Sequence, residues 1–150
     1  MENKFDTMPN AEEIISNFEL IDDWEERYRY LIELGQEMDP LSPDEHNSAN
    51  KVLGCASQVW LKLTVESDGA ETRLRLRGDS DAHIVRGLVA LMIALYSGRT
   101  LPEAMAIDPV GILARIGLEQ HLTPQRSNGL RSMVERIRHD TQAAMAALQA

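Results

Sequence analysis

Cys55 is the only cysteine of the chain, and its setting favours chemistry. Gly54 precedes it, and the run GCASQVW leads into residues that alternate as in a strand. Because glycine lets the backbone bend tightly, we expect the thiol on a turn at the edge of a sheet, where functional residues are common. The alternative is a structural role, since unpaired cysteines are often buried and pack as small hydrophobes.

A reactive thiol needs a neighbour, because the thiolate is the nucleophile and its proton must be accepted or its charge stabilised. His121 lies just ahead of an expected helix start, where a polar side chain stays outside the core, and is the candidate proton acceptor. Arg126, in the first turn of that helix, is a candidate for stabilising an anionic sulfur or holding a carboxylate. Surface or capping roles are the alternative for both residues, and their distance from Cys55 does not follow from the sequence.

The residue types present restrict the chemistry further. A cysteine hydrolase needs a Cys–His pair, an orienting group and an oxyanion hole, and no motif marks these parts. A sulfur carrier needs only one thiolate that attacks a persulfide and some shelter for the product. A single cysteine excludes self-contained four-thiolate sites, and the four histidines lack metal-ligand spacing, so we expect no metal site.

Length and composition predict one domain over residues 1–150, with residues 1–9 and 146–150 flexible. Hydrophobic residues make up 43% and charged residues 26%, as in ordinary globular proteins. A net charge of −9 argues against nucleic acid, which requires a basic face, and favours protein partners. No apolar run has membrane-spanning length and the start lacks secretory features, so we expect no membrane association and a cytoplasmic location.

Capping residues and apolar spacing predict two helices in the first quarter of the chain. Asn10 with Glu13 resembles a capping box that begins a helix ending near Leu20. Asp22 or Asp23 is expected to cap a second helix, whose apolar residues recur at spacings of three and four. The following stretch, 39–48, holds two prolines and little apolar content, which predicts an exposed connection into the cysteine turn.

The middle of the chain predicts a β-hairpin followed by a buried helix. Apolar and polar residues alternate from Val59 to Val65, a turn follows at residues 68–69, and a return strand covers residues 71–77. Its arginines at 73, 75 and 77 are better explained by a solvated strand face than by docking of an acidic partner. Asp79 or Ser80 is expected to cap a mostly apolar helix through residue 95.

Short helices with proline in the first turn are expected after Thr100 and Asp108, and a long amphipathic helix after Thr123. Gly98 is expected to end the central helix in a left-handed conformation.

Four ordered motifs resemble the SufE-like sulfur acceptors, which work with pyridoxal-phosphate cysteine desulfurases. The first lies in the second helix, the second surrounds the cysteine, the third begins the central helix and the fourth begins the last helix. They are residues 23–25 (DWE) with Tyr28 and residues 33–35 (ELG), residues 50–60 (NKVLGCASQVW), residues 78–82 (GDSDA) with 84–88 (IVRGL), and residues 121–130 (HLTPQRSNGL).

The resemblance implies an α+β fold in which a small antiparallel sheet packs against several helices, with Cys55 as the persulfide-carrying residue. It implies a protein that docks on a cysteine desulfurase, stimulates it, takes its sulfane sulfur and passes the sulfur to an iron–sulfur scaffold. The pyridoxal phosphate stays on the desulfurase, so this chain is expected to bind no cofactor. It is then a sulfurtransferase-type carrier rather than a stand-alone enzyme.

Supporting roles are expected for other residues in the matching motifs. Gly54 permits the turn, Ser57 and Gln58 can hydrogen-bond the turn backbone, and Trp60 is expected to provide an apolar wall near the thiol. Asp79 and Asp81, in the third motif, complete the supporting set together with His121 and Arg126. Because a persulfide is easily reduced or oxidised, we expect Cys55 to be partly sheltered in the free protein and to emerge on docking.

Two other functions are weighed against sulfur transfer. An iron–sulfur scaffold of related fold would need further thiolates to hold a cluster, and a thiol redox sensor would need a resolving thiol. The chain supplies neither. The sequence does not indicate the cognate desulfurase, the final sulfur acceptor, the oligomeric state or any regulation.

Overall fold

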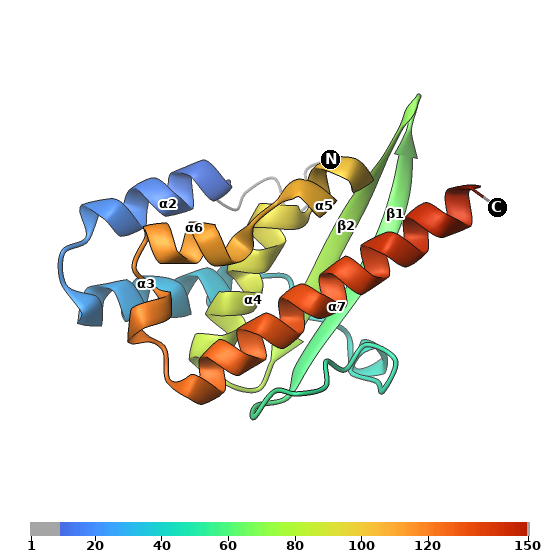
Figure 1. Ribbon diagram of the computed structural model, residues 1–150. Helices are drawn as coiled ribbons and strands as arrows, with labels where there is room; N and C mark the ends of the chain where they lie inside the picture. The colour runs from blue at the N-terminus through green and yellow to red at the C-terminus, as the bar shows by residue number, and fades with distance from the viewer. Residues whose placement is uncertain (1–9, 150) are drawn as a thin grey trace.

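The computed structural model describes residues 10–149, and the expected flexibility of residues 1–9 and 150 lies outside that range. In chain order the elements are α2 (Ala11–Leu20), α3 (Trp24–Glu37), the 3₁₀ turn η1 (Pro43–Glu45), β1 (Val59–Asp68), β2 (Glu71–Ser80), α4 (His83–Tyr96), α5 (Leu101–Ala106), α6 (Pro109–Arg115), the 3₁₀ turn η2 (Glu119–His121) and α7 (Pro124–Gln149). The expected α+β fold, with a small antiparallel sheet packed on helices, is confirmed (Figure 1).

The first helices begin where side chains satisfy free backbone N–H groups. The Asn10 side chain accepts a hydrogen bond from the Glu13 N–H, and Asp23 accepts one from Glu25, as the capping pattern predicts. Helix α2 then buries Ile14 and Phe18. Thr100 and Asp108 likewise cap α5 and α6.

β1 and β2 form a two-stranded antiparallel hairpin, paired from Val59 opposite Ser80 to Asp68 opposite Glu71. The predicted alternation holds, since Leu61, Leu74 and Leu76 are buried on the inner face. On the outer face the three arginines form ion pairs within the chain: Arg73 with Glu71, Arg75 with Glu66 and Arg77 with Glu45. Neutralised in this way, they give a solvated face rather than a basic patch.

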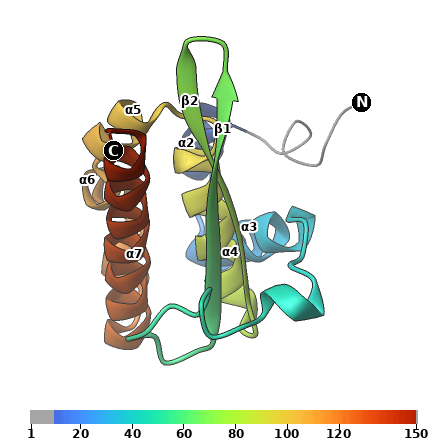
Figure 2. The same ribbon diagram turned by 90° about the vertical axis from the view of Figure 1, so that its right-hand side faces the viewer.

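The central helix α4 packs between α3 and β2, as its nearly uniform apolar sequence predicts. Its contact with α3 is very close: a Cβ on Gly87 would lie 2.2 Å from the Leu31 carbonyl oxygen. Helix α7 contacts β1 and α5 and buries Leu130, Met133 and Ile137. Figure 2 shows α7 as a column beside the hairpin and α4.

One sequence-based expectation needs correction here. Asp79 and Ser80 do not cap α4, because β2 continues through both residues, and α4 begins at His83 after Ala82, which makes no side-chain capping bond. The connection at 39–48 is largely exposed, as expected; within it Leu41 is buried and η1 carries a capping box between Ser42 and Glu45.

The last helix continues through Gln149, so residues 146–149 are helical. Among the residues that the structure describes, no helix has both the length and the apolarity needed to cross a membrane.

Candidate functional site

The cysteine lies on a loop, residues 53–58, that is closed at its base by a hydrogen bond. The Val52 N–H donates to the Val59 carbonyl oxygen at 2.8 Å, so the loop leaves and re-enters the sheet at one point. Gly54 has a φ of +88°, and a Cβ there would lie 2.7 Å from Ser132 Oγ of α7. The positive φ favours glycine, so Gly54 sets the turn that brings the loop carrying Cys55 close to α7.

The C-terminal end of this loop is fastened through the backbone of Gln58. The Gln58 N–H donates to Asp81 Oδ1 at 3.0 Å, and the Gln58 carbonyl oxygen accepts from Ser80 Oγ at 2.7 Å. Asp81 therefore supports the cysteine loop from the junction between β2 and α4. The Gln58 side chain is exposed, and the bonds that hold this position come from its main chain.

The Asp79 carboxylate contacts the segment that precedes the cysteine loop, at His46, and not the Cys55 thiol. Its buried carboxylate lies 2.9 Å from His46 Nε2 and 3.2 Å from Arg86 Nε. The His46 Nδ1 atom lies 2.7 Å from the Ser42 carbonyl oxygen. Trp60 packs edge-on against the His46 ring, with 4.6 Å between ring centroids, and is not among the residues that line the cysteine cavity. The expectation that Trp60 forms the wall beside the thiol is therefore corrected.

The Cys55 thiol is half-buried beside α7 and faces a cavity of about 190 Å³. Its S–H donates to the Gly129 carbonyl oxygen, with 3.6 Å between sulfur and oxygen. Burial raises the pKa of the Cys55 thiol above its ordinary value. At neutral pH the resting site therefore holds a protonated, weakly reactive thiol. The cavity is lined by Cys55, Ala56, Ser57, Val85, Thr123, Gln125, Arg126, Gly129 and Met133.

The start of α7 brings positive charge to this cavity. Arg126 lines it and is half-buried, and its backbone N–H donates to Thr123 Oγ1 at 3.3 Å. The N-terminal end of a helix carries a partial positive charge that favours anions. Arg126 and the N-terminal turn of α7 thus line the same cavity as Cys55, together with the apolar residues Val85 and Met133.

The structure brings Ser57 and Arg126 together with Cys55, but it places His121 elsewhere. The exposed His121 ring stacks on Trp24, with 3.5 Å between ring centroids, and the Tyr28 hydroxyl donates to the His121 carbonyl oxygen. His121 does not line the cysteine cavity. These contacts attach η2 to α3, and they give His121 a structural position rather than that of a proton acceptor for the thiol.

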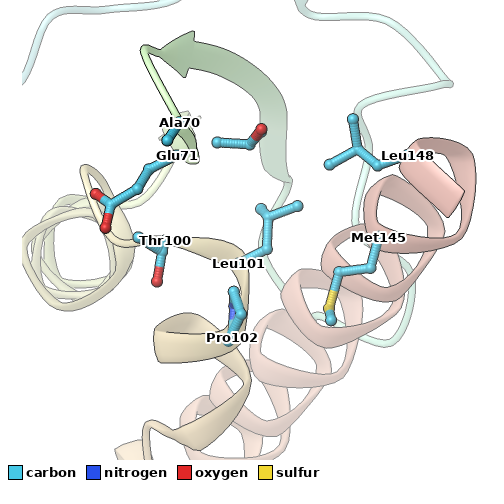
Figure 3. Close-up of a pocket in the computed structure, with 8 residues that line it drawn as sticks. Ala70, Glu71, Thr100, Leu101, Pro102, Met145 and Leu148 are labelled. Atoms are coloured by element: carbon cyan, nitrogen blue, oxygen red, sulfur yellow. The ribbon is translucent and has the colours of Figure 1, made fainter.

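A second cavity, of about 360 Å³, lies near the hairpin tip and the other end of α7, roughly 30 Å along the helix axis from Arg126. Figure 3 shows Met145 and Leu148 of α7 facing Leu101 and Pro102 of α5 across it. Its lining residues include no cysteine or histidine. Within the described part of the chain, no group of three His, Cys, Asp or Glu residues is arranged to hold a metal ion. The Cys55 cavity is therefore the candidate site.

Sequence reasoning did not connect six of the nine lining residues with the thiol: Ala56, Val85, Thr123, Gln125, Gly129 and Met133. Val85 and Met133 have the spacing of core residues in helices, and Gly129 is one glycine in an amphipathic pattern. Nothing local to these positions shows that they meet a loop that is distant in the sequence. The one available signal was that Val85 and Gly129 lie inside the family motifs at residues 84–88 and 121–130.

The fold and the site together define a small α+β domain that presents one half-buried thiol on a tethered loop. The chain belongs to the SufE family: the family model, described as an Fe-S metabolism associated domain, matches residues 12–141. The resemblance found in the sequence is thus confirmed, and with it an association with iron–sulfur metabolism.

Similar proteins agree with this assignment. An uncharacterized SufE-like protein from Rhizobium etli is 49% identical over 140 residues, which cover 93% of this chain and 95% of that protein. A second, from Rhizobium meliloti, is 46% identical over 140 residues, covering 93% of this chain and all of that protein. The solution structure of a hypothetical protein from Thermus thermophilus has the same fold, with a TM-score of 0.70 at 20% identity over 91% of this chain and 96% of that one.

Proposed function

We propose that this protein accepts sulfane sulfur on Cys55 from a pyridoxal-phosphate cysteine desulfurase, stimulates that enzyme, and delivers the sulfur to an iron–sulfur cluster assembly scaffold. Membership in a family associated with Fe-S metabolism supports the pathway. The observation that carries the mechanism is the half-buried Cys55 thiol at a small cavity lined by Arg126. We place this activity in the cytoplasm, with the cofactor on the desulfurase.

The transfer is a thiol exchange with no net oxidation. The Cys55 thiolate attacks the terminal sulfur of the desulfurase persulfide, a new S–S bond forms at Cys55 Sγ, and the desulfurase S–S bond breaks. The electron pair of the broken bond leaves on the desulfurase cysteine, which regains a thiolate. Cys55 then carries an S–SH group until the scaffold thiol attacks its terminal sulfur in the same way.

The resting state of the site suits this role. Burial raises the pKa of the Cys55 thiol, so that the free protein exposes little thiolate to stray oxidants or small thiols. Docking on the desulfurase draws the loop out, hydrates the thiol and allows it to ionise. Arg126 and the start of α7 stabilise the anionic sulfur near the cavity.

The test is direct detection of the transferred sulfur. The protein is mixed with a cysteine desulfurase, cysteine and pyridoxal phosphate, and the intact mass is measured with and without reductant. We expect one reductant-sensitive sulfur on Cys55, faster turnover of the desulfurase, and neither effect in Cys55→Ser. Absence of added sulfur on the wild-type protein, with the desulfurase active, would refute the proposal.

Tests on the same purified protein distinguish sulfur transfer from the two alternative functions. A cluster scaffold would bind iron and become coloured after anaerobic reconstitution, although it would need thiolates that this chain lacks. A redox sensor would form a sulfenic acid with peroxide and then need a thiol from another molecule to resolve it.

A further inference from the structure

Gly129 is the one glycine of the chain that neither backbone conformation nor close packing explains. Of the nine glycines, four adopt positive φ angles, where other residues are strained. At four more, an added Cβ would lie closer than 3.0 Å to a neighbouring atom. The first group is Gly54, Gly69, Gly98 and Gly117, and the second is Gly35, Gly78, Gly87 and Gly111.

An alanine would fit at position 129 as the structure stands. Its Cβ would lie 3.6 Å from Cys55 Sγ and 3.8 Å from Cys55 Cβ, which is ordinary van der Waals contact. Gly129 also lies inside α7, where glycine is among the least favourable residues and alanine the most favourable. The free thiol therefore does not require glycine here, and the helix would be more stable without it.

A persulfide on Cys55 changes the comparison between glycine and alanine at position 129. The terminal sulfur of Cys55–S–SH lies about 2.05 Å beyond Sγ, the length of a sulfur–sulfur bond. If it points at about 45° to the line from Sγ to position 129, the 3.6 Å separation and the bond of about 2.05 Å place it only about 2.6 Å from an alanine Cβ, whereas non-bonded heavy atoms need about 3.5 Å or more. An alanine would thus exclude the second sulfur from the direction that glycine leaves open.

We propose that Gly129 is a positioning residue that keeps open the space occupied by the terminal sulfur of the Cys55 persulfide, an inference that rests on the proposed function. The space belongs to the cavity of about 190 Å³, which has room for one more sulfur atom. Buried Val85 and Met133 wall it with apolar groups, and Arg126 lines it as the cation for an anionic sulfur. The loaded loop can therefore return to α7 and shield its sulfur.

The experiment compares Gly129→Ala with the wild-type protein, using Gln142→Ala as a control on the exposed surface of the same helix. Each protein is loaded by a desulfurase with cysteine and pyridoxal phosphate, and the desulfurase is removed. Loss of the extra sulfur to a fixed concentration of glutathione is followed by mass spectrometry. Each loss rate is divided by the rate at which iodoacetamide alkylates the unloaded Cys55 of the same variant, so that general changes in access cancel.

We expect Gly129→Ala to melt at or above the wild-type temperature, because alanine favours helix more than glycine does. We also expect it to lose its sulfur about tenfold faster, which is the effect of a typical overpacking penalty. Gln142→Ala should match the wild type. Adding Val85→Ala to the Gly129→Ala protein enlarges the same cavity at another of its lining residues and should restore retention, which a purely structural effect on α7 would not do. A persistent defect in a folded double variant would count against the argument from space.

The possible outcomes distinguish the proposed role of Gly129 from the proposed carrier function. If the wild type takes up sulfur and folded Gly129→Ala retains it equally well, the role of Gly129 is refuted and the carrier function stands. If the wild type takes up no sulfur from an active desulfurase, the function fails and the inference fails with it.

Discussion

Replacing Glu45 by glutamine should remove a defined part of the stability that this protein has above pH 4. The Glu45 carboxylate accepts a hydrogen bond from the Ser42 N–H at 2.9 Å and pairs with Lys62 Nζ at 3.0 Å and Arg77 Nη1 at 2.8 Å. The backbone hydrogen bond from Ser42 is the largest cause, with Lys62 next, of a pKa lowered from 4.5 to about 2. These bonds hold η1 against both strands of the hairpin.

The magnitude follows from the linkage between proton binding and folding. A lowering of about 2.5 pKa units at about 1.36 kcal/mol per unit sets an upper limit near 3.4 kcal/mol. Because the Lys62 and Arg77 side chains are 40% and 32% exposed, solvent screens the pairs, and about 1–2 kcal/mol is the realistic contribution. Since the folded-state pKa is the lower one, this stability is present above the unfolded pKa and is lost as the pH falls towards 2.

The assay is urea denaturation of the wild type and Glu45→Gln over a series from pH 7 downwards, with Glu135→Gln on the exposed face of α7 as the matched control. Glutamine keeps an acceptor for the Ser42 N–H but loses the charge. The two unfolding free energies should differ by about 1–2 kcal/mol at pH 7 and converge below pH 4.5. A difference that stays constant across the whole series would refute the electrostatic explanation, because Gln cannot titrate.

Four further predictions concern the thiol and the residues proposed to support it. Because burial raises its pKa, the Cys55 thiol should react with iodoacetamide more slowly at pH 7 in the folded than in the urea-unfolded protein. In the folded protein the alkylation rate should rise only at a pH above that at which an ordinary thiol ionises. Equal rates in the folded and unfolded protein would contradict this prediction. His121→Ala should lower the unfolding free energy by about 1 kcal/mol through its lost ring stacking and leave Cys55 alkylation unchanged, whereas Arg126→Ala should slow sulfur uptake from a desulfurase by about tenfold. Gly54→Ala should cost about 1–2 kcal/mol in urea denaturation for its positive φ alone, and part of any excess should be recovered with Ser132→Ala, which removes the hydroxyl 2.7 Å from the new Cβ.

Local rules predicted most of the framework because they act between residues close in the sequence. The hydrogen bonds at Asn10, Asp23 and Thr100 lie within three residues of their caps. The hairpin followed from a period of two and a glycine turn, and the burial of α4 from its apolar run. The resemblance to the family then singled out Cys55 as the candidate reactive residue, where the residues alone left a reactive and a packing role open.

The errors arose where distant segments meet. His121 precedes α7 as expected, but its ring faces α3 and stacks on Trp24 instead of turning towards the thiol. Asp79 was expected at a helix N-terminus, yet it continues β2 because His46 and Arg86 supply partners for its carboxylate there. Both errors depend on a contact with a distant segment or on where a strand or helix ends. The local spacing of apolar residues predicts neither.

The hydrogen bond between Val52 and Val59 determines how far the sulfur can travel. Only the six residues 53–58 lie outside this closure, and a chain extends by at most about 3.5 Å per residue, so the tip of the loop reaches roughly 10 Å from its anchor. In the proposed transfer, this full reach requires release of the contact to α7 and of the Gln58 backbone bonds to Ser80 and Asp81, while the two strands stay paired. Under the proposed function, the donor desulfurase and the recipient scaffold would each have to bring a cysteine within that radius.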